Sequence, residues 1–440
     1  MVPATLTRYR VFSRVEAPPP GVRVLPVLAD VGGRPGFDCG GFCKYCYFRG
    51  VDRRKARPFG CKNCPPGTVG CDYCGRSVWE DNGPFRPPQA VLQAVHMTIA
   101  MSGPPEDGTV EVSGGGDVSH YPWLRELIEA LVDVLGFERV KLGYTSCKGF
   151  EDPEVVEELC DMGVDSVSVT VFAWDEDLRR EWMNDPSPDV SLKAVEVFAD
   201  RCSEVVAAAV VIPGVNDGEV LRRTCEELEA LGVDAFLLMR LGTRKEHGII
   251  LGNDPVLDVE PHPVDEFKRL VTELHEEFDG LRVVGTPVWD PETGAPFALR
   301  SLGEGLKDLL PPVEVPFSLI TGRIAAPMIE EVFRHVEGGE NVDVVPVGKD
   351  IACLITEEDL KGLDPARLKR TVVIPGRALV HDGRAEELLK RDGFGRVVLR
   401  GPDRLTLDGE ASCCLTKDEV LEFELEAFRE LIQTVNLLGE

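Results

Sequence analysis

Long apolar segments are missing from this sequence. Nowhere do the roughly 18 uninterrupted apolar residues occur that a membrane-spanning helix needs. The opening residues, MVPATLTRYRVFSRVE, also lack the apolar core of an export signal. We therefore expect a cytoplasmic protein with no membrane partner.

Positive charge is also scarce. Lys and Arg number 48 against 76 Asp and Glu, so the formal net charge is −28. Electrostatic binding of nucleic acid depends on clustered cations that neutralise phosphates, so this balance argues against a nucleic-acid partner. The basic run from Arg49 to Lys62 is interpreted as a solvated loop.

Cysteine, by contrast, is abundant. Of the 14 cysteines, seven lie between positions 39 and 74. In a long chain without an export signal, such density indicates metal or iron–sulfur ligation rather than disulfides. The other seven cysteines lie in apolar segments, where we expect them to pack as small hydrophobic residues.

The middle of the chain alternates helical and strand patterns. Apolar residues at helical spacing over 88–101 lead into a strand-like run at 109–113. Further helices are predicted at 122–135, 153–162, 191–200, 218–231 and 264–278, with strands at 139–145, 165–172, 204–212, 234–240 and 281–284. Several strands are apolar on both faces, as parallel strands covered by helices are. The fold class is therefore α/β, as a partial (β/α) barrel.

A proline-rich stretch near 285–316 separates this pattern from a different one. Beyond it, short β-like runs alternate with turns at 315–320, 342–347, 351–355, 371–376, 396–401 and 404–409, before a helix at 417–435. The predicted organisation is an N-terminal segment 1–36, a barrel 37–285 that includes a metal-bearing loop at 48–80, a linker 286–312 and a separate C-terminal α+β domain 313–440.

The first cysteine group has the spacing C-x-x-x-C-x-x-C. Cys39, Cys43 and Cys46 can hold three irons of a 4Fe-4S cluster, which leaves the fourth iron open. This is typical of radical S-adenosylmethionine (SAM) enzymes, in which SAM occupies the open iron and supplies the radical chemistry. Tyr45 matches the aromatic position that lies near the adenine in these enzymes. A zinc site with a distant fourth ligand and a ferredoxin-like cluster are the alternatives.

A glycine-rich segment follows the first predicted strand after the cysteines. Gly114, Gly115 and Gly116 allow close approach of backbone, and Asp117 is a candidate for the ammonium group of SAM. Other polar or turn-forming residues stand at strand ends, where barrel enzymes place their sites. The candidates for contact with SAM among them are Thr145, Ser168, Thr170 and Pro213.

The second cysteine group consists of two C-x-x-C pairs. Cys61, Cys64, Cys71 and Cys74 are suited to a closed tetrahedral site for mononuclear iron or zinc. Such a site is expected to pin the long loop 48–80. An auxiliary electron-transfer cluster is the competing interpretation.

Three strings together, CGGFCKYCYFRG, PFGCKNCPPGTVGCDYC and SGGGDVSHYP, resemble the methanogenesis marker protein 10 family. Members of that family are cobalamin-dependent radical SAM methyltransferases that C-methylate an arginine of methyl-coenzyme M reductase. The resemblance implies a barrel of the radical SAM type, mononuclear iron in the four-cysteine loop and a cobalamin-binding C-terminal domain. It implies Tyr121 as a ligand of the open iron when SAM is absent, and Leu319 near the lower face of cobalamin. No D-x-H-x-x-G motif for a histidine ligand of cobalamin is found.

The same resemblance implies the α subunit of methyl-coenzyme M reductase and a low-potential electron donor as partners. For the guanidinium of a substrate arginine, the sequence offers Asp165, Asp175 and Glu176 as carboxylates and Trp174 as a stacking partner. The alternatives are a radical SAM enzyme that modifies a peptide without cobalamin and, in another class, an iron–sulfur electron carrier or scaffold.

Overall fold

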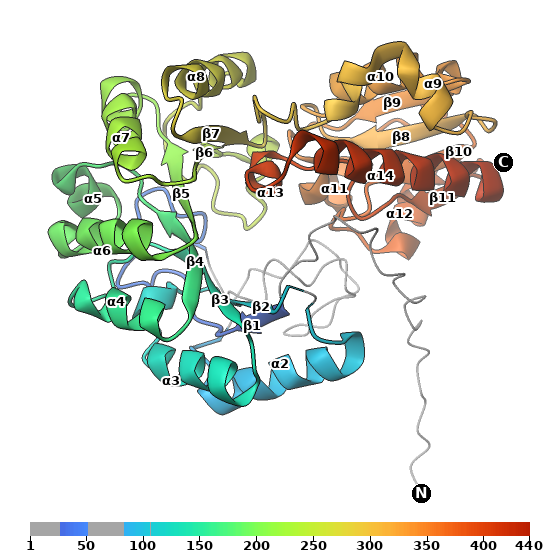
Figure 1. Cartoon of the computed structure of the whole chain (residues 1–440). Helices are drawn as coiled ribbons and strands as arrows, with labels where there is room; N and C mark the ends of the chain where they lie inside the picture. Colours follow the sequence, from blue (N-terminus) through green and yellow to red (C-terminus); the bar gives the residue numbers. More distant parts are fainter. Residues whose placement is uncertain (1–26, 52–82, 106) are drawn as a thin grey trace, which may run out of the picture.

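The structure, a computed structural model, describes residues 27–51, 83–105 and 107–440. Within these ranges the chain forms two parallel sheets, one of seven strands and one of four, which Figure 1 shows beside each other. The predicted metal site at Cys61, Cys64, Cys71 and Cys74 lies outside the described residues, as does most of the loop 48–80.

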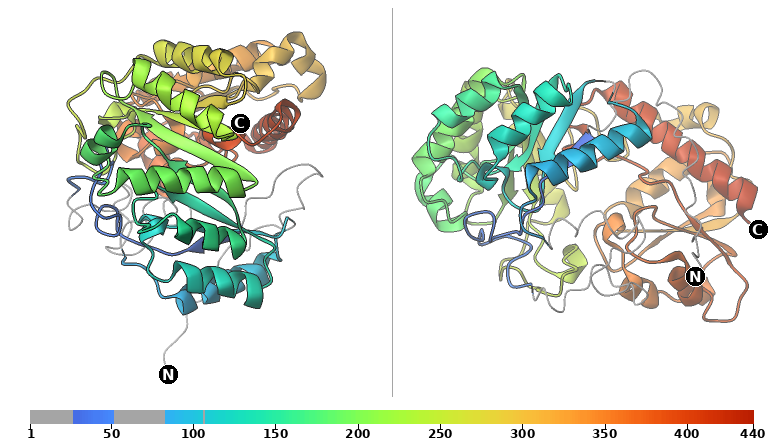
Figure 2. Two further views of the ribbon diagram at one scale, coloured as in Figure 1. Left: turned by 60° about the vertical axis from the view of Figure 1, so that its left-hand side comes forward. Right: turned by 90° about the horizontal axis from the view of Figure 1, so that it is seen from below.

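The seven-stranded sheet keeps the order of the sequence. Its parallel strands are β1 (Val27–Asp30), β2 (Thr109–Ser113), β3 (Arg139–Thr145), β4 (Val164–Thr170), β5 (Glu204–Val211), β6 (Ala235–Arg240) and β7 (Arg282–Thr286). The helices that follow them are α2 (Pro88–Ser102), α3 (Leu124–Glu129), α4 (Glu154–Asp161), α5 (Glu176–Trp182), α6 (Pro188–Arg201), α7 (Gly218–Ala230) and α8 (Val264–Glu277). Figures 1 and 2 show the sheet curved like part of a barrel, with helices outside. The predicted partial (β/α) barrel is confirmed.

Three local features differ from the predicted pattern. β1 lies within the segment 1–36, which the sequence pattern left without a strand. The helix α5 was not expected, because its exposed charged residues conceal a short apolar face. The expected helix at 122–135 is instead a 3-10 turn at Val118–His120, α3, and a π-helical turn at Ala130–Val134.

The two faces of this sheet differ in polarity. The outer face packs valine, leucine and phenylalanine against the helices in one large core. On the inner face, β5 to β7 are apolar, with Val206, Ala208, Leu237 and Val284 in a smaller cluster. Since strand residues alternate between faces, the neighbours of the outer-core residues on β2 to β4 must face inward, and they include Glu111, Lys141 and Ser168. The interior of the barrel is therefore polar on one side only.

The four-stranded sheet has the order β11-β10-β8-β9, and all its pairs are parallel. The strands are β8 (Phe317–Thr321), β9 (Val342–Pro346), β10 (Thr371–Ile374) and β11 (Val397–Arg400), and the helices are α10 (Ala326–Arg334), α11 (Glu357–Lys361), α12 (Asp382–Leu389) and the long α14 (Lys417–Leu438). Strands and helices alternate, which is more regular than the α+β arrangement expected. The expected β-like runs at 351–355 and 404–409 are not strands: the first contains a 3-10 turn, Ala352–Leu354, and the second is irregular up to Asp408, with Gly409 beginning a short helix.

The stretch predicted as a linker takes part in the second core. Residues 298–305 form a 3-10 helix, followed by α9 (Leu306–Leu309), and Phe297, Leu299 and Leu306 are buried against α14 and β8. Proline and glycine mark chain reversals here, but the apolar residues between them are packed. Boundaries read from composition alone therefore miss this contact.

A short helix of the C-terminal part also covers the inner face of the barrel. Cys413, directly after α13 (Gly409–Ser412), packs against Val206, Ala208 and Val284. Arg282 of β7 donates to the carbonyl of Ser412 at 2.9 Å. The two sheets are thus joined through residues near 409–415.

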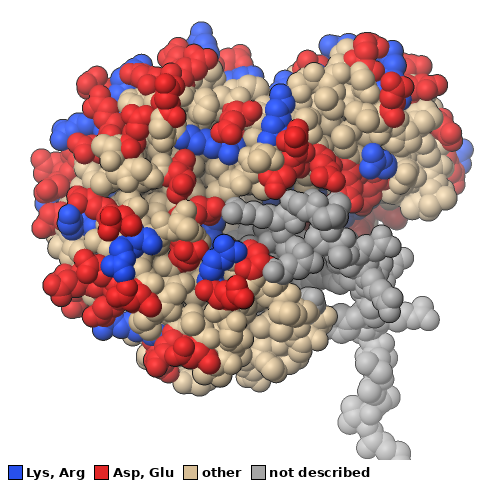
Figure 3. Space-filling model, in the orientation of Figure 1, with Lys and Arg blue, Asp and Glu red and all other residues tan. Residues whose placement is uncertain are grey.

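The surface carries the acidic excess in mixed form. On the face drawn in Figure 3, basic side chains are interspersed among more numerous acidic ones. None of the helices within the described ranges is long and apolar enough to cross a membrane.

Candidate functional site

The cysteine loop crosses the carboxyl ends of the barrel strands. It follows β1 and is held by backbone hydrogen bonds from both sides: the amide of Asp117 donates to the carbonyl of Asp38 at 3.1 Å, and the amide of Lys44 donates to that of Trp182 at 2.8 Å. Loops after β2 and α5 thus hold the segment that carries Cys39, Cys43 and Cys46.

Two glycines explain why the loop can lie so close to its neighbours. Gly41 has φ of +118°, and a Cβ there would stand 2.1 Å from the side-chain nitrogen of Asn184. A Cβ on Gly116 would meet the ring of Phe85 at 2.9 Å and the carbonyl of Asp38 at 3.0 Å. These positions require glycine, as expected from the sequence for the glycine-rich segment.

The three thiols lie in one half-buried region. Burial raises the pKa of Cys46 to about 12, and charge on Cys43 and Cys39 adds to this effect. Burial, followed by the charge of Asp117, raises the pKa of Cys39 to about 11. Thiolates that repel one another in a buried place are stabilised by a cation, which is what iron supplies. The donor set therefore fits a 4Fe-4S cluster.

Within the described ranges, no group of three or more His, Cys, Asp and Glu side chains could hold a single metal ion. A cubane cluster binds each cysteine to a different iron, so its ligands need not converge as those of mononuclear zinc do. Both the cluster and the zinc alternative stay predictions.

Tyr45 forms the wall beside the thiols. Its ring stacks on Phe172 with centroids 5.0 Å apart and 12° between the planes. Phe172 is in turn fixed because Asn216, which is fully buried, donates to its carbonyl at 2.9 Å. Asn216 also accepts from the amide of Ile212 at 2.7 Å, which closes the turn containing Pro213. The loops after β4 and β5 thus build an apolar surface next to the cysteines.

Asp117 is the hub of the polar side. Its carboxylate accepts hydrogen bonds from the hydroxyls of Ser119 at 2.7 Å and Thr145 at 2.8 Å, and from both the amide and the hydroxyl of Ser146. Burial acts to raise the pKa of Asp117, but the hydrogen bonds from Ser146, Ser119 and Thr145 together lower it. The carboxylate that was predicted to meet SAM is thus engaged within the protein, as is the hydroxyl of Thr145.

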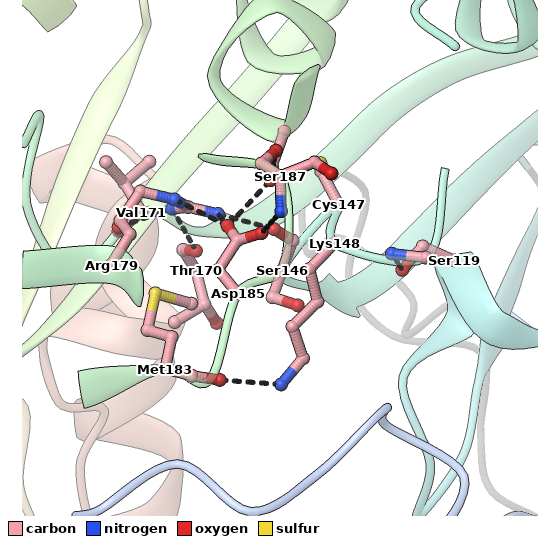
Figure 4. A network of polar contacts seen from close by, with 12 residues as sticks. Ser119, Ser146, Cys147, Lys148, Thr170, Val171, Arg179, Met183, Asp185 and Ser187 are labelled. Carbon is pink, nitrogen blue, oxygen red and sulfur yellow. Dashed lines mark hydrogen bonds and ion pairs between the residues drawn. The ribbon is translucent and has the colours of Figure 1, made fainter. Parts of the chain in front are cut away.

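A buried ion pair lies behind this hub. Arg179 of α5 and Asp185 are both fully buried and 2.9 Å apart. Arg179 also donates to the carbonyls of Val171 at 2.6 Å and Ser146 at 2.8 Å, so it fixes the chain after β3 and β4 together (Figure 4). The sequence offered no signal for Arg179, because it reads as one of several charges on a short helix.

The remaining predicted residues divide by position. Tyr121 is buried, and its hydroxyl donates to the carbonyl of Arg86 at 2.8 Å, while its ring contacts Phe85 and Trp123. Burial raises the pKa of this hydroxyl. Its role as an iron ligand stays a prediction.

The candidates for the substrate guanidinium are not brought together. Asp165 lies at the amino end of β4, where it accepts from the hydroxyl of Ser203 at 2.8 Å, whereas the cysteine loop lies at the carboxyl ends. Trp174 is half-buried against the outer core, and Asp175 caps α5 by accepting from the amide of Leu178 at 2.9 Å. Glu176 is exposed and paired with Arg180 at 3.7 Å.

Ser168 and Thr170 are half-buried on β4. Of the two, Thr170 is at the carboxyl end, near the cysteine loop, and its carbonyl accepts from Arg179. Leu319 is 2 % exposed and packs inside the second core, among Phe317 and Phe333. In the structure its side chain is therefore covered by protein.

Comparison with known proteins places the site in context. A family model described as "Radical SAM superfamily" matches residues 34–228. This range contains the cysteine loop, the glycine segment and Arg179. A curated relative, the FeMo cofactor biosynthesis protein NifB of Klebsiella pneumoniae, is 26 % identical over 243 residues, which are 50 % of this chain and 49 % of NifB. The chain thus spans about half the length of that relative.

Several solved structures are similar to part of this chain. SuiB of Streptococcus suis has a TM-score of 0.40 at 14 % identity, covering 59 % of this chain and 49 % of SuiB. A radical SAM methyltransferase from Sphaerobacter thermophilus has a TM-score of 0.36 at 15 % identity, covering 61 % and 68 %. TsrM of Kitasatospora setae, solved with cobalamin and a [4Fe-4S] cluster, has a TM-score of 0.29 at 15 % identity, covering 42 % and 33 %.

Proposed function

We propose that this chain is a cobalamin-dependent radical SAM methyltransferase that C-methylates a peptidyl arginine of methyl-coenzyme M reductase. The match of residues 34–228 to the radical SAM superfamily supports the radical SAM part of this proposal. The observation that carries the proposal is the half-buried loop with Cys39, Cys43 and Cys46, held against the carboxyl ends of the strands. The strings of the second cysteine group and of the glycine segment support the family.

The bound groups supply the radical and the methyl group, and the protein supplies position and exclusion of water. Cys39, Cys43 and Cys46 would hold the cluster, while Tyr45 and Phe172 would offer an apolar face to the adenine of SAM. Asp117 and Arg179 hold the loops after β2, β3 and β4 in fixed positions relative to one another. The residues near 409–415 cover part of the inner face and keep water from it.

The polarity of the interior supports a cationic substrate. Glu111 on β2 is half-buried, and burial raises the pKa of its carboxyl. Glu410 in α13 is exposed. Glu410 accepts from the hydroxyl of Tyr144 at 2.8 Å, which positions one carboxylate at the junction of the two sheets. Carboxylates in such a place suit a guanidinium group, with which they can form charged hydrogen bonds.

Cobalamin enters the proposal through the family resemblance. The strand order of the second sheet adds support. β9 is added on one side of β8, whereas β10 and β11 are added on the other, and open parallel sheets bind ligands at the carboxyl ends of the strands beside such a switch point. Since Leu319 is covered by protein, a contact with cobalamin would come from the loops after these strands. One of these loops begins with Gly322, after β8. A Cβ at this position would stand only 2.3 Å from the carbonyl oxygen of Asp350, so the close contact requires glycine.

The test is anaerobic reconstitution of the full chain with iron, sulfide, SAM and a low-potential reductant, with and without cobalamin. A peptide that copies the arginine segment of the reductase should gain the mass of one CH2 group only when cobalamin is present. Cys43→Ser should form no deoxyadenosine, whereas the matched variant Cys353→Ser, at an exposed cysteine elsewhere, should behave as the parent.

Each outcome separates the alternatives. Deoxyadenosine without any need for cobalamin, together with a modified peptide, would favour the peptide-modifying enzyme. A cluster that never cleaves SAM would favour the electron carrier. Failure of the full chain to bind cobalamin would refute the proposed methyltransferase.

A further inference from the structure

Lys148 is a buried lysine close to the cysteine loop. It follows β3 after Cys147, whose positive φ of 62° turns the chain toward the cysteine loop. Lys148 is only 6 % exposed, and its ammonium donates to the carbonyls of Met183 at 2.8 Å and Gly41 at 3.2 Å. Figure 4 shows the side chain reaching to Met183 above the cysteine loop. Among the described residues, no carboxylate forms a salt bridge with it.

Both acceptors of Lys148 are neighbours of Cys43, one in the sequence and one in space. Gly41 stands between Cys39 and Cys43 in the sequence, and the carbonyl of Met183 lies 3.6 Å from the sulfur of Cys43. One ammonium therefore ties the loop to the turn after α5. Asn184 adds a second tie, because its side chain donates to the carbonyl of Gly40 at 2.8 Å.

A buried cation bound only to neutral carbonyls is costly unless a negative charge compensates it. The thiolates of the loop can supply this charge, because Gly41, whose carbonyl accepts from Lys148, lies between Cys39 and Cys43. A 4Fe-4S cluster with three thiolates becomes more negative when it is reduced. A positive group beside it stabilises that reduced form.

We propose that Lys148 is a positioning residue for the cluster: it pins the cysteine loop through Gly41 and raises the reduction potential through its charge. This inference rests on the proposed function only in requiring a cluster at Cys39, Cys43 and Cys46. Neither SAM cleavage nor methyl transfer is needed to test it.

The experiment measures the midpoint potential of the reconstituted cluster by anaerobic titration, followed by electron paramagnetic resonance. Lys148→Met removes the charge and both hydrogen bonds and replaces the lysine by an unbranched apolar side chain that is one atom shorter. We expect the equilibrium for reduction to become about tenfold less favourable, which is about 59 mV for one electron. Lys148→Arg keeps the charge and should stay near the parent.

Two variants separate charge from local packing. Asn184→Ala removes a neighbouring hydrogen bond of the same loop without changing charge, and Lys193→Met removes a charge from the exposed face of α6. Both should leave the potential at the parent value. An unchanged potential in Lys148→Met, or an equal fall in Asn184→Ala, would overturn the role of the charge.

A second measurement covers the case in which Lys148→Met does not load a cluster. In the apoprotein, the three thiols should be alkylated about tenfold faster in Lys148→Met than in the parent, because the loop opens more often. Lys148→Arg should restore slow alkylation. Equal rates in all three proteins would overturn the pinning. If the parent itself binds no cluster, the proposed function fails, whereas a difference confined to these variants concerns Lys148 alone.

Discussion

Two buried aspartates anchor opposite parts of the barrel. Asp117 lies at the carboxyl ends of the strands, where Ser119, Thr145 and Ser146 donate to it. Asp290 follows β7 and accepts from Ser412 at 2.6 Å and Arg282 at 2.9 Å. The first holds the loops around the cysteines, and the second holds α13 against the sheet.

The difference lies in the donors. The hydrogen bonds of Asp117 come from hydroxyl and amide groups, whereas Asp290 has a full cationic partner. A carboxylate with a cationic partner makes a firm joint. Asp117 instead keeps its negative charge through hydrogen bonds from Ser119, Thr145 and Ser146. A buried aspartate thus connects two parts of the fold at position 290, and at position 117 it holds the loops around the cysteines.

The largest expected effect concerns the end of the barrel that holds Asp117, where we expect SAM to be cleaved. Cys43→Ser should abolish cleavage of SAM, because a cluster with three cysteine ligands has no spare thiolate in the loop. The free energy of unfolding of the apoprotein should barely change, since the side chain is only half-buried. Deoxyadenosine is measured by chromatography after reconstitution. Normal formation in Cys43→Ser, equal to that in Cys353→Ser, would contradict the assignment.

The next effect concerns the ion pair that stiffens the site. Arg179→Met should lower the free energy of unfolding by about 3–5 kcal/mol, because it leaves Asp185 buried without its cation. Arg180→Met is the matched control on the same helix, because Arg180 is exposed and paired with Asp177 at the surface. The control should change the free energy by less than about 0.5 kcal/mol. Urea unfolding of the two apoproteins measures both, and equal stabilities would show that the buried pair is not structural.

Breaking the contacts of Asp290 should lower the free energy of unfolding by less than breaking the Arg179–Asp185 ion pair. Asp290→Asn weakens the bonds from Arg282 and Ser412, and we expect a loss of about 2–3 kcal/mol, typical of a hydrogen bond to a charged group with a buried donor left behind. Cys413 should become more reactive to alkylation, because it packs against the inner face beside this joint. Iron content of the reconstituted protein should not change. Loss of the cluster in Asp290→Asn would mean that the two ends are coupled.

The sequence predicted the barrel well, because helices and strands of ordinary length alternate from 88 to 284 and each has a clear period. It also predicted the glycines and thiols of the loop, since their spacing follows from the chemistry of the cluster. It did not reveal Arg179, Asp185 or Lys148. Each of these is a charged residue that the fold buries, and burial of a charge depends on partners distant in sequence.

The second sheet was harder to predict for a related reason. Its strands are only four or five residues long, and its helices α11 and α12 are five and eight residues long, so neither gives a long periodic signal. The run at 351–355 reads as a strand because Ile351, Leu354 and Ile355 are apolar, yet it forms a 3-10 turn between β9 and α11. Asp165 was predicted as a candidate for the substrate guanidinium, but it lies at the amino end of β4, away from the cysteine loop. The direction of the strand, not its composition, decides this.

The smallest effect uses pH to compare the two aspartates. Burial acts to raise the pKa of Asp290, but Ser412, Arg282 and Thr293 together lower it, as the hydroxyls lower that of Asp117. A carboxyl whose pKa is depressed by folding stabilises the protein above its unfolded pKa of about 3.9, and this stability is lost as the pH falls through the folded pKa. The difference in unfolding free energy between the parent and Asp290→Asn should therefore be constant near neutral pH and shrink below about pH 4. Asp117→Asn should behave likewise, whereas Glu292→Gln, at an exposed partner of Arg282, should show little dependence. Urea unfolding of the apoproteins at a series of pH values measures this, and a gap for Asp290→Asn that widened on acidification would contradict the direction of the pKa shift.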